Sequence, residues 1–286
     1  MKKIAWYFLL LFVCFSGDRL GAYLLEKQSM QSQFRFSKLY KGESAAEILL
    51  LGNSRGLTFY QPYIEQITGK STCNLSYNGL PMDAAKVLVQ DYLERYPAPK
   101  NLLIDITTCD RENDALLSGF LTYSAQSARL DTLIQRKLPK VWWGGKVSGL
   151  FRFNNEIFQR ALFYRNKTDK DWLLDRSINS ELARQVASHT YDLEISTYLL
   201  QQLGETVSAA QTKGVRVTLV IGPYFPGFKV NKLDDLKQAV EKTTGIQVQD
   251  FRAALSDPSD FGDFMHPNKK GSQAYMDLLK SAGFFD

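Results

Sequence analysis

Three residues from opposite ends of the chain have the types that acyl transfer through a serine requires. The apolar run 48–51 breaks into Gly52-Asn53-Ser54, and Asp263 stands three positions before His266. A serine hydroxyl is a poor nucleophile unless a base takes its proton and a third group holds that base. We therefore predict a catalytic triad in which Ser54 is the nucleophile, His266 is the base and Asp263 orients the imidazole ring.

Each of these residues also has an ordinary structural interpretation. A serine that follows a strand often caps the next helix, a histidine before a proline can be structural, and Asp263 can be a solvated loop charge. Their arrangement favours chemistry over these alternatives. A strand and Gly-x-Ser near the start, Asp-x-x-His near the end and a helix directly after it form a combination that unrelated turns seldom produce.

The elements that must position these residues alternate along the chain. Continuous apolar runs predict strands, and apolar residues at helical spacing predict helices between and after them. Alternating strands and helices predict a parallel sheet with helices on both faces. Ligands bind at the carboxyl ends of such strands, where Ser54 stands. The predicted strands are 48–51, 72–75, 101–106, 215–221 and a short one after 246–248, and the helices are 85–96, 195–210, 232–244 and 271–282.

The combination resembles the SGNH (GDSL-type) hydrolase superfamily. Gly52-Asn53-Ser54 stands where that family has Gly-Asp-Ser, Asp263-x-x-His266 matches its last block, and residues 74–79 match the block whose glycine N–H helps to form an oxyanion hole. The resemblance covers residues 47–80 and 215–280. It implies a three-layer, flavodoxin-like parallel sheet, an acyl-serine intermediate, and an oxyanion hole made by the backbone N–H groups of Ser54 and Gly79.

The chain departs from the family at its third block. There the family often has Gly-x-Asn-Asp, whose asparagine is an oxyanion donor, whereas this chain has Asp-Ile-Thr-Thr-Cys-Asp at 105–110. Thr107, Thr108 and Asn113 are alternatives for the third donor, and the sequence does not choose among them.

Three further residues are candidates for substrate binding at the same sheet edge: Arg55, Asn78 and Tyr224. For Arg55, pairing with an acid is the favoured interpretation and binding of an anionic substrate is the alternative. For Tyr224, a rigid apolar loop is the alternative to a wall facing the substrate.

The N-terminus predicts a membrane anchor. Lys2 and Lys3 precede an uncharged run that ends at Gly17, Asp18-Arg19 interrupt it, and 20–25 is apolar again with no A-x-A cleavage pattern. We predict an uncleaved signal-anchor helix within residues 1–28, and a cleaved signal peptide is the alternative. The two lysines favour an inside N-terminus, which places the rest of the chain outside the cytoplasm.

Residues 29–286 are expected to form one SGNH-like domain with a helical insertion at about 110–190. The insertion is rich in aromatic and basic residues and has no strand pattern. Two interpretations remain open for it: a lid or surface for sugar or a partner protein, or a helical subdomain with its own small core.

Composition limits the other classes of function. The chain has 286 residues, is 44% hydrophobic and carries a net charge of +5, with basic and acidic residues interspersed. This does not fit nucleic-acid binding, which concentrates positive charge. Only two histidines and no paired-cysteine spacing exclude a histidine-rich metal site, and no cofactor is expected. A disulfide between Cys73 and Cys109 stays open as an alternative.

The anchor, the insertion and the altered third block together resemble a narrower group: membrane-anchored SGNH-like proteins of bacterial envelope polysaccharide O-acetylation systems. This resemblance implies an extracytoplasmic, periplasmic or cell-surface serine O-acyltransferase or acetylesterase. Its substrate would be an envelope polysaccharide and its candidate partner a membrane-bound O-acyltransferase. The rival hypothesis is a non-catalytic SGNH-fold subunit that binds glycan or docks to a membrane acyltransferase complex.

Overall fold

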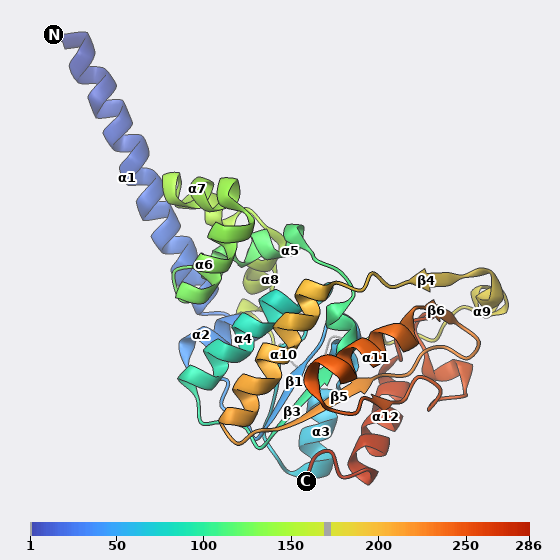
Figure 1. Ribbon diagram of the computed structural model, residues 1–286. Coiled ribbons are helices and arrows are strands. Elements are labelled where there is room, and N and C mark those ends of the chain that lie inside the picture. The colour runs from blue at the N-terminus through green and yellow to red at the C-terminus, as the bar shows by residue number, and fades with distance from the viewer. Residues whose placement is uncertain (1, 169–172) are drawn as a thin grey trace. The chain divides into compact units, whose positions relative to one another are not determined.

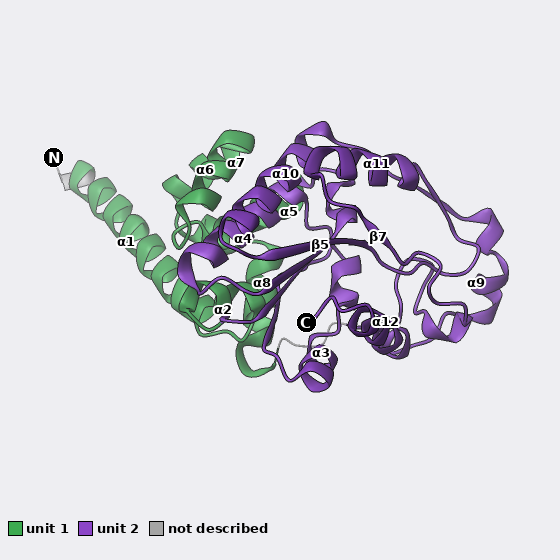
Figure 2. Ribbon diagram, turned by 60° about the horizontal axis from the view of Figure 1, so that its bottom comes forward, with its two compact units in different colours: residues 1–43, 114–169 green, residues 44–113, 170–286 purple. Residues whose placement is uncertain are grey.

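The computed structural model describes residues 2–168 and 173–286, which form two compact units (Figures 1 and 2). Unit 1 comprises residues 1–43 and 114–169, and unit 2 comprises residues 44–113 and 170–286. Each unit is therefore built from two separate stretches of chain.

Unit 2 is an α/β structure around a five-stranded parallel sheet with the strand order β2-β1-β3-β5-β7. The α/β class and the parallel sheet predicted from the sequence are confirmed. The strands are β1 Ile48–Leu51, β2 Thr72–Asn74, β3 Asn101–Asp105, β5 Arg216–Ile221 and β7 Gln249–Asp250.

The central strands β1 and β3 are buried at every residue. A parallel strand that is covered on both faces has no solvent-facing side, which explains the nearly continuous apolar runs in both. Because β1 lies between its two neighbours, Leu50 is opposite both Asn74 of β2 and Leu103 of β3. The loops that follow these three strands therefore start at the same edge of the sheet.

Helices cover both faces of the sheet (Figure 2). On one face, Ile48 and Leu50 pack with Ile64 of α3 and with Tyr275 and Met276 of α12. Helices α4, α10 and α11 lie on the other face, where α10 packs against both α4 and α11. The helices predicted from apolar spacing are all present: α4 Met82–Arg95, α10 Thr197–Thr212, α11 Leu233–Thr244 and α12 Lys269–Ser281, with α3 Gln61–Thr68 in addition.

Two short strands of unit 2 were not expected from the sequence. Strand β4, Thr190–Asp192, pairs in parallel with β6, Lys229–Asn231, and the two form a separate small sheet. Both strands are exposed at their first and last residues. Such short exposed strands have no apolar pattern that could identify them. A short helix, α9 Ser180–Arg184, precedes β4.

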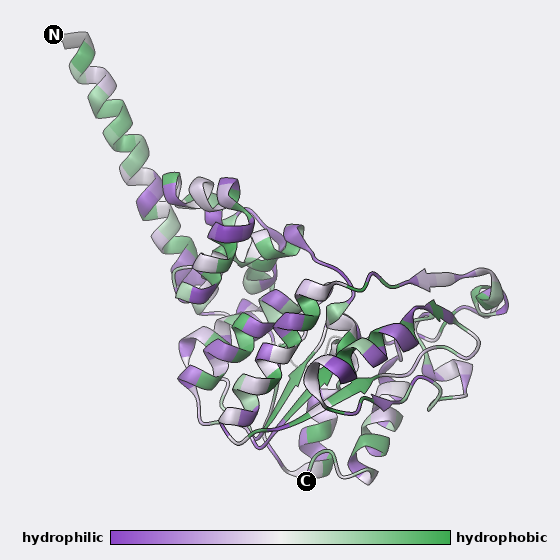
Figure 3. Ribbon diagram, in the orientation of Figure 1, coloured by the Kyte–Doolittle hydropathy of each residue, from purple (hydrophilic) through white to green (hydrophobic). Residues whose placement is uncertain are grey.

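Unit 1 is helical in its described residues. Its longest helix, α1, runs without interruption over Lys2–Met30. From Ile4 onward it is long and apolar enough to cross a membrane, which Figure 3 shows as a mostly green helix, although a signal sequence has the same character. The other helices are α2 Arg35–Lys41, α5 Asp114–Gly119, α6 Ala128–Lys137, α7 Pro139–Val147 and α8 Glu156–Phe163.

The second half of α1 is part of the core of unit 1. Ala22 is buried against Phe153 and Phe158, and Leu25 packs on the same cluster. Glu26 also pairs with Arg152 at 3.1 Å. The helix is thus longer than the predicted anchor, and its end is built into a folded unit.

Unit 1 joins part of the predicted insertion to the N-terminal segment of the chain. Of the predicted insertion 110–190, only 114–169 falls in unit 1, where it joins residues 1–43. The physical reason is that the insertion buries one side of the second half of α1. The sequence does not reveal this, because the apolar run of the helix has no polar face.

Candidate active site

The structure brings together the three residues of the predicted triad in unit 2. The Ser54 Oγ lies 2.9 Å from Nε2 of His266. The other ring nitrogen of His266, Nδ1, lies 2.9 and 3.0 Å from the two carboxylate oxygens of Asp263. These are hydrogen-bond distances, so a proton can pass from the serine to a histidine that is held by a carboxylate.

Two glycines make the turn that presents Ser54. A Cβ on Gly52 would lie 2.5 Å from the Cα of Gly56, and a Cβ on Gly56 would lie 2.4 Å from the Oγ of Ser76. Only glycine tolerates such close approaches. The chain therefore leaves β1 in a tight turn and enters a short 3₁₀ helix, Arg55–Thr58, with Ser54 at its start.

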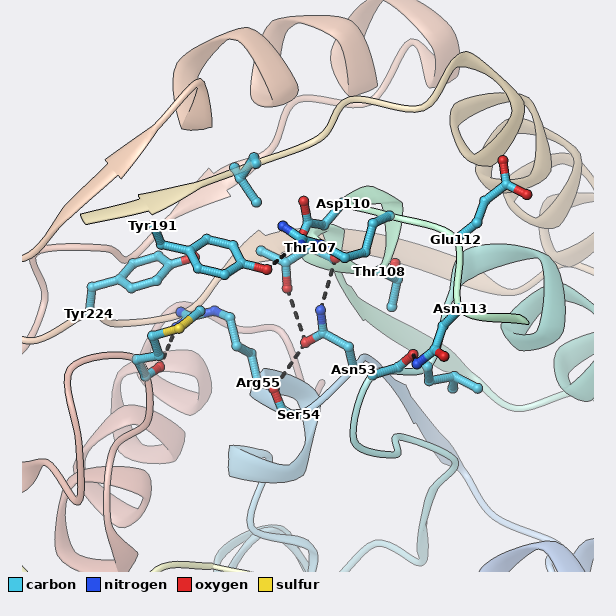
Figure 4. Close-up of a pocket in the computed structure, with 15 residues that line it drawn as sticks. Asn53, Ser54, Arg55, Thr107, Thr108, Asp110, Glu112, Asn113, Tyr191 and Tyr224 are labelled. Carbon is cyan, nitrogen blue, oxygen red and sulfur yellow. Dashed lines mark hydrogen bonds and ion pairs between the residues drawn. The ribbon is translucent and has the colours of Figure 1, made fainter. Parts of the chain in front are cut away.

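Asn53 ties this turn to the loop after β3. Its Nδ2 donates to the carbonyl of Thr107 at 2.9 Å, and its Oδ1 accepts from the backbone N–H of Arg55 at 3.0 Å. The Thr107 hydroxyl lies 3.2 Å from the same Oδ1 (Figure 4). The side chain of Asn53 thus ties the backbone just after Ser54 to the loop after β3.

Hydrogen bonds to Asp263 hold the loop that carries His266. One carboxylate oxygen accepts the backbone N–H groups of Met265 at 2.8 Å and of His266 at 2.9 Å, in addition to the ring nitrogen. Partial burial raises the pKa of Asp263, but the His266 ring and these two N–H groups outweigh it and hold the pKa below its ordinary value. Asp263 is therefore in its charged form when it faces the histidine.

This shift predicts a dependence of stability on pH. The folded chain favours ionised Asp263, so its contribution is present above the ordinary carboxyl range and is lost as the pH falls through the lowered pKa. We expect Asp263→Asn to destabilise the protein more at about pH 7 than at about pH 3. Thermal unfolding at both values measures the difference, with Asp235→Asn on the exposed side of α11 as the control. An equal deficit at both values would contradict the prediction.

Arg55 connects the segments at the carboxyl edge of the sheet. Its buried guanidinium lies 3.7 Å from the carboxylate of Asp105, donates to the carbonyls of Pro223 at 3.1 Å and of Met265, and stacks 3.6 Å over the ring of Tyr224. These contacts favour the structural pairing over the substrate-binding role. The bond to Met265 also holds the loop that carries His266.

Ser54 lines two separate cavities. The first has a volume of about 340 Å³ and is lined by Arg55, Gly79 and Tyr224 among others (Figure 4). The second, of about 250 Å³, is lined by Asn78, Asp263 and His266. The predicted substrate-binding residues are therefore divided, with Arg55 and Tyr224 at the first cavity and Asn78 at the second.

Gly79 lines the first cavity together with a side chain that the sequence left undecided. Gly79 has a φ of +66°, and its carbonyl accepts the Nδ2 of Asn113 at 3.0 Å. The hydroxyl of Thr107 donates to Asp105, and that of Thr108 bonds the Asp105 carbonyl at 3.1 Å. Among the three alternatives for the third oxyanion donor, Asn113 is the one whose side-chain amide hydrogen-bonds to Gly79.

Sequence reasoning missed several polar residues of the first cavity, among them Asp110 and Tyr191. The Tyr191 hydroxyl donates to the Asp110 carboxylate at 2.5 Å, and the backbone N–H of Glu194 donates to it at 2.7 Å. Burial, followed by this hydrogen bond, raises the pKa of Tyr191, and burial raises that of Tyr224 to about 12. Tyr191 comes from the unexpected strand β4, so no sequence signal places it here.

The described residues contain no group of three histidine, cysteine or acidic side chains arranged to hold a metal ion. Cys73 and Cys109 are buried and free, so they do not form the disulfide that the sequence left open.

Comparison with known proteins does not assign this chain to a family. No family model matches it, and no curated protein matches it.

Proposed function

We propose that unit 2 is an SGNH-type serine acyltransferase or esterase. The observation that carries this proposal is the hydrogen-bonded series of Ser54, His266 and Asp263, with both links at 2.9 Å. The strand order β2-β1-β3-β5-β7 is the flavodoxin-like order that the family resemblance implies. The tight Gly52-to-Gly56 turn supports it as well, since it sets the serine at the edge where such sheets bind ligands.

The proposed reaction proceeds in two halves. His266 Nε2 takes the Ser54 proton as Oγ attacks the carbonyl carbon of an ester, and the resulting oxyanion accepts N–H groups of Ser54 and Gly79. Collapse of this intermediate releases the alcohol, which takes the proton from His266 and leaves an acyl-serine. A sugar hydroxyl or water then gives its proton to His266 as it attacks the acyl carbon, and His266 returns this proton to Oγ as the acyl bond to Ser54 breaks.

The setting of this reaction follows from the N-terminal helix. We propose that α1 is an uncleaved anchor with Lys2 and Lys3 inside, and that unit 2 acts outside the cytoplasm on an envelope polysaccharide. A membrane-bound O-acyltransferase is then the proposed source of acyl groups. The cavity beside His266 and Asn78 suits the acceptor, because the base must reach the acceptor hydroxyl.

A fluorophosphonate probe tests the proposal on the full chain. The wild-type protein should be labelled on the peptide that contains Ser54, and Ser54→Ala should not be labelled, whereas the exposed Ser188→Ala should react like wild type. Failure of the folded wild-type protein to react would reject the enzyme. It would favour the non-catalytic glycan-binding or docking subunit instead.

We also propose Asn113 as the third oxyanion donor. Loss of one such donor costs ~10²–10³-fold in kcat, so Asn113→Ala should lose that much turnover of an aryl acetate with little change in KM. Asn78→Ala, beside the second cavity, is the matched control and should change turnover of this small ester far less. Equal effects of the two substitutions would remove Asn113 from the oxyanion hole.

A further inference from the structure

Unit 1 exposes large apolar side chains well beyond the apolar start of α1. Helix α1 stays exposed after Asp18 on one side, while its other side packs into the unit. Helix α7 and the following 3₁₀ turn, Leu150–Phe153 (η4), expose further apolar residues. On α1 these are Leu20, Tyr23 and Leu24, and the α7–η4 patch consists of Trp143, Val147, Leu150 and Phe151, which are 61, 73, 41 and 46% exposed.

Asp18 and Arg19 attach the α7–η4 patch to α1. The Arg19 guanidinium donates to the carbonyls of Lys146 and Val147, both at 3.1 Å, at the end of α7. The Asp18 carboxylate accepts the backbone N–H groups of Gly149 at 2.7 Å and Leu150 at 3.2 Å, at the start of η4. A cation at a helix C-terminus and an anion at an N-terminus are each stabilising. The two charged side chains that interrupt the apolar run therefore bind backbone groups within unit 1.

The length of α1 sets the depth of this attachment. From Ile4 to Asp18 an α-helix rises ~21 Å, at ~1.5 Å per residue. The hydrocarbon core of a bilayer is ~30 Å thick, so a helix that enters it at Ile4 leaves it near Tyr23. Asp18 and Arg19, with the backbone that they hold, then lie inside the hydrocarbon boundary. The exposed Leu20 and Tyr23 fit the same depth.

We propose that the α7–η4 patch is embedded in the outer leaflet of the bilayer that α1 spans. The inference goes beyond the proposed function and rests on the proposed anchoring by α1. Its partner is the lipid itself, because the exposed apolar patch is attached directly to the helix that is proposed to span the bilayer. Aromatic Trp143 and Tyr23 suit the membrane interface, and the exposed Lys140 at the start of α7 can reach the headgroups.

Tryptophan quenching tests the depth of the patch. The full chain is placed in vesicles of phosphatidylcholine and phosphatidylglycerol, as three variants that each keep one tryptophan and replace the other three by phenylalanine. Trp143, kept alone, should lose most of its emission to a lipid that carries a doxyl group near the headgroup end of its acyl chain. Its emission maximum should also move to shorter wavelength. The neighbouring Trp142, whose ring lies 5.0 Å from that of Trp143 and whose indole nitrogen is buried, should report the same depth with weaker quenching.

The variant that keeps Trp6 separates the two parts of the inference. Trp6 lies in the apolar start of α1 and should be quenched by a doxyl group placed in the bilayer. Quenching of Trp6 without quenching of Trp143 would overturn the embedded patch and leave the anchor in place. A lack of quenching at both would overturn the anchor and the patch together. Labelling of Ser54 by the fluorophosphonate probe in the same vesicles reports on the proposed enzyme independently.

Discussion

Replacing Ser54 by alanine is expected to lower kcat for an aryl acetate by roughly 10⁵–10⁶-fold, and His266→Ala should do the same. The serine Oγ and the imidazole Nε2 share one hydrogen bond, so neither can act without the other. The double variant should therefore be no slower than either single one. Initial rates with the full chain measure this effect.

The fold should survive these substitutions. Both side chains lie at the rim of cavities, and neither is fully buried. Circular dichroism and thermal unfolding should thus match wild type, which separates lost chemistry from lost structure. Losses that multiply in the double variant would show that the two residues act independently and that the triad is not the reacting unit.

Replacing Arg55 by methionine is expected to destabilise the protein by about 3–5 kcal/mol. The substitution keeps the volume but leaves the Asp105 carboxylate, which is 1% exposed, without its cation. It also removes the bonds to the carbonyls of Pro223 and Met265. Thermal unfolding of the full chain in detergent measures the loss, and activity should fall with it because the His266 loop loses its support.

Two variants control this prediction. Asp105→Asn added to Arg55→Met should recover part of the stability, since it removes the buried charge. Lys100→Met breaks the exposed ion pair with Glu47 and should cost far less stability, because solvent screens such a pair. If Arg55→Met destabilises the protein no more than Lys100→Met, the interpretation of Arg55 as the buried partner of Asp105 is wrong.

The sequence was most informative where the sheet is covered on both sides. Strands β1 and β3 are buried at every residue, so burial alone produced the apolar runs that identified them. The triad could be predicted for a related reason. Ser54 directly follows β1, and the turn made by Asp263 with His266 is local, so short motifs encode both pieces.

Long-range pairings between exposed segments could not be predicted. Tyr191 reaches Asp110 from strand β4, which has three residues and is largely exposed. The partners of Asp18 could not be predicted either. A charged residue within an apolar run does not indicate which distant segment will donate backbone N–H groups to it. The proposal of Asn113, rather than a threonine, as the third oxyanion donor rests on loop conformation, which residue types alone do not determine.

The attachment of α1 to η4 has a consequence for the order in which the chain is made. The Asp18 carboxylate and the Gly149 N–H that it accepts are 131 positions apart in sequence. At ~5–20 residues per second, roughly 7–26 s pass between the synthesis of one and the other. Throughout that interval the carboxylate has no backbone donor from η4, and the Ala22 side of the helix has no Phe153 to cover it. The first segment to leave the ribosome therefore has to wait until about half of the 286-residue chain is made before it can form these contacts, and a chain that stops before residue 149 cannot complete unit 1.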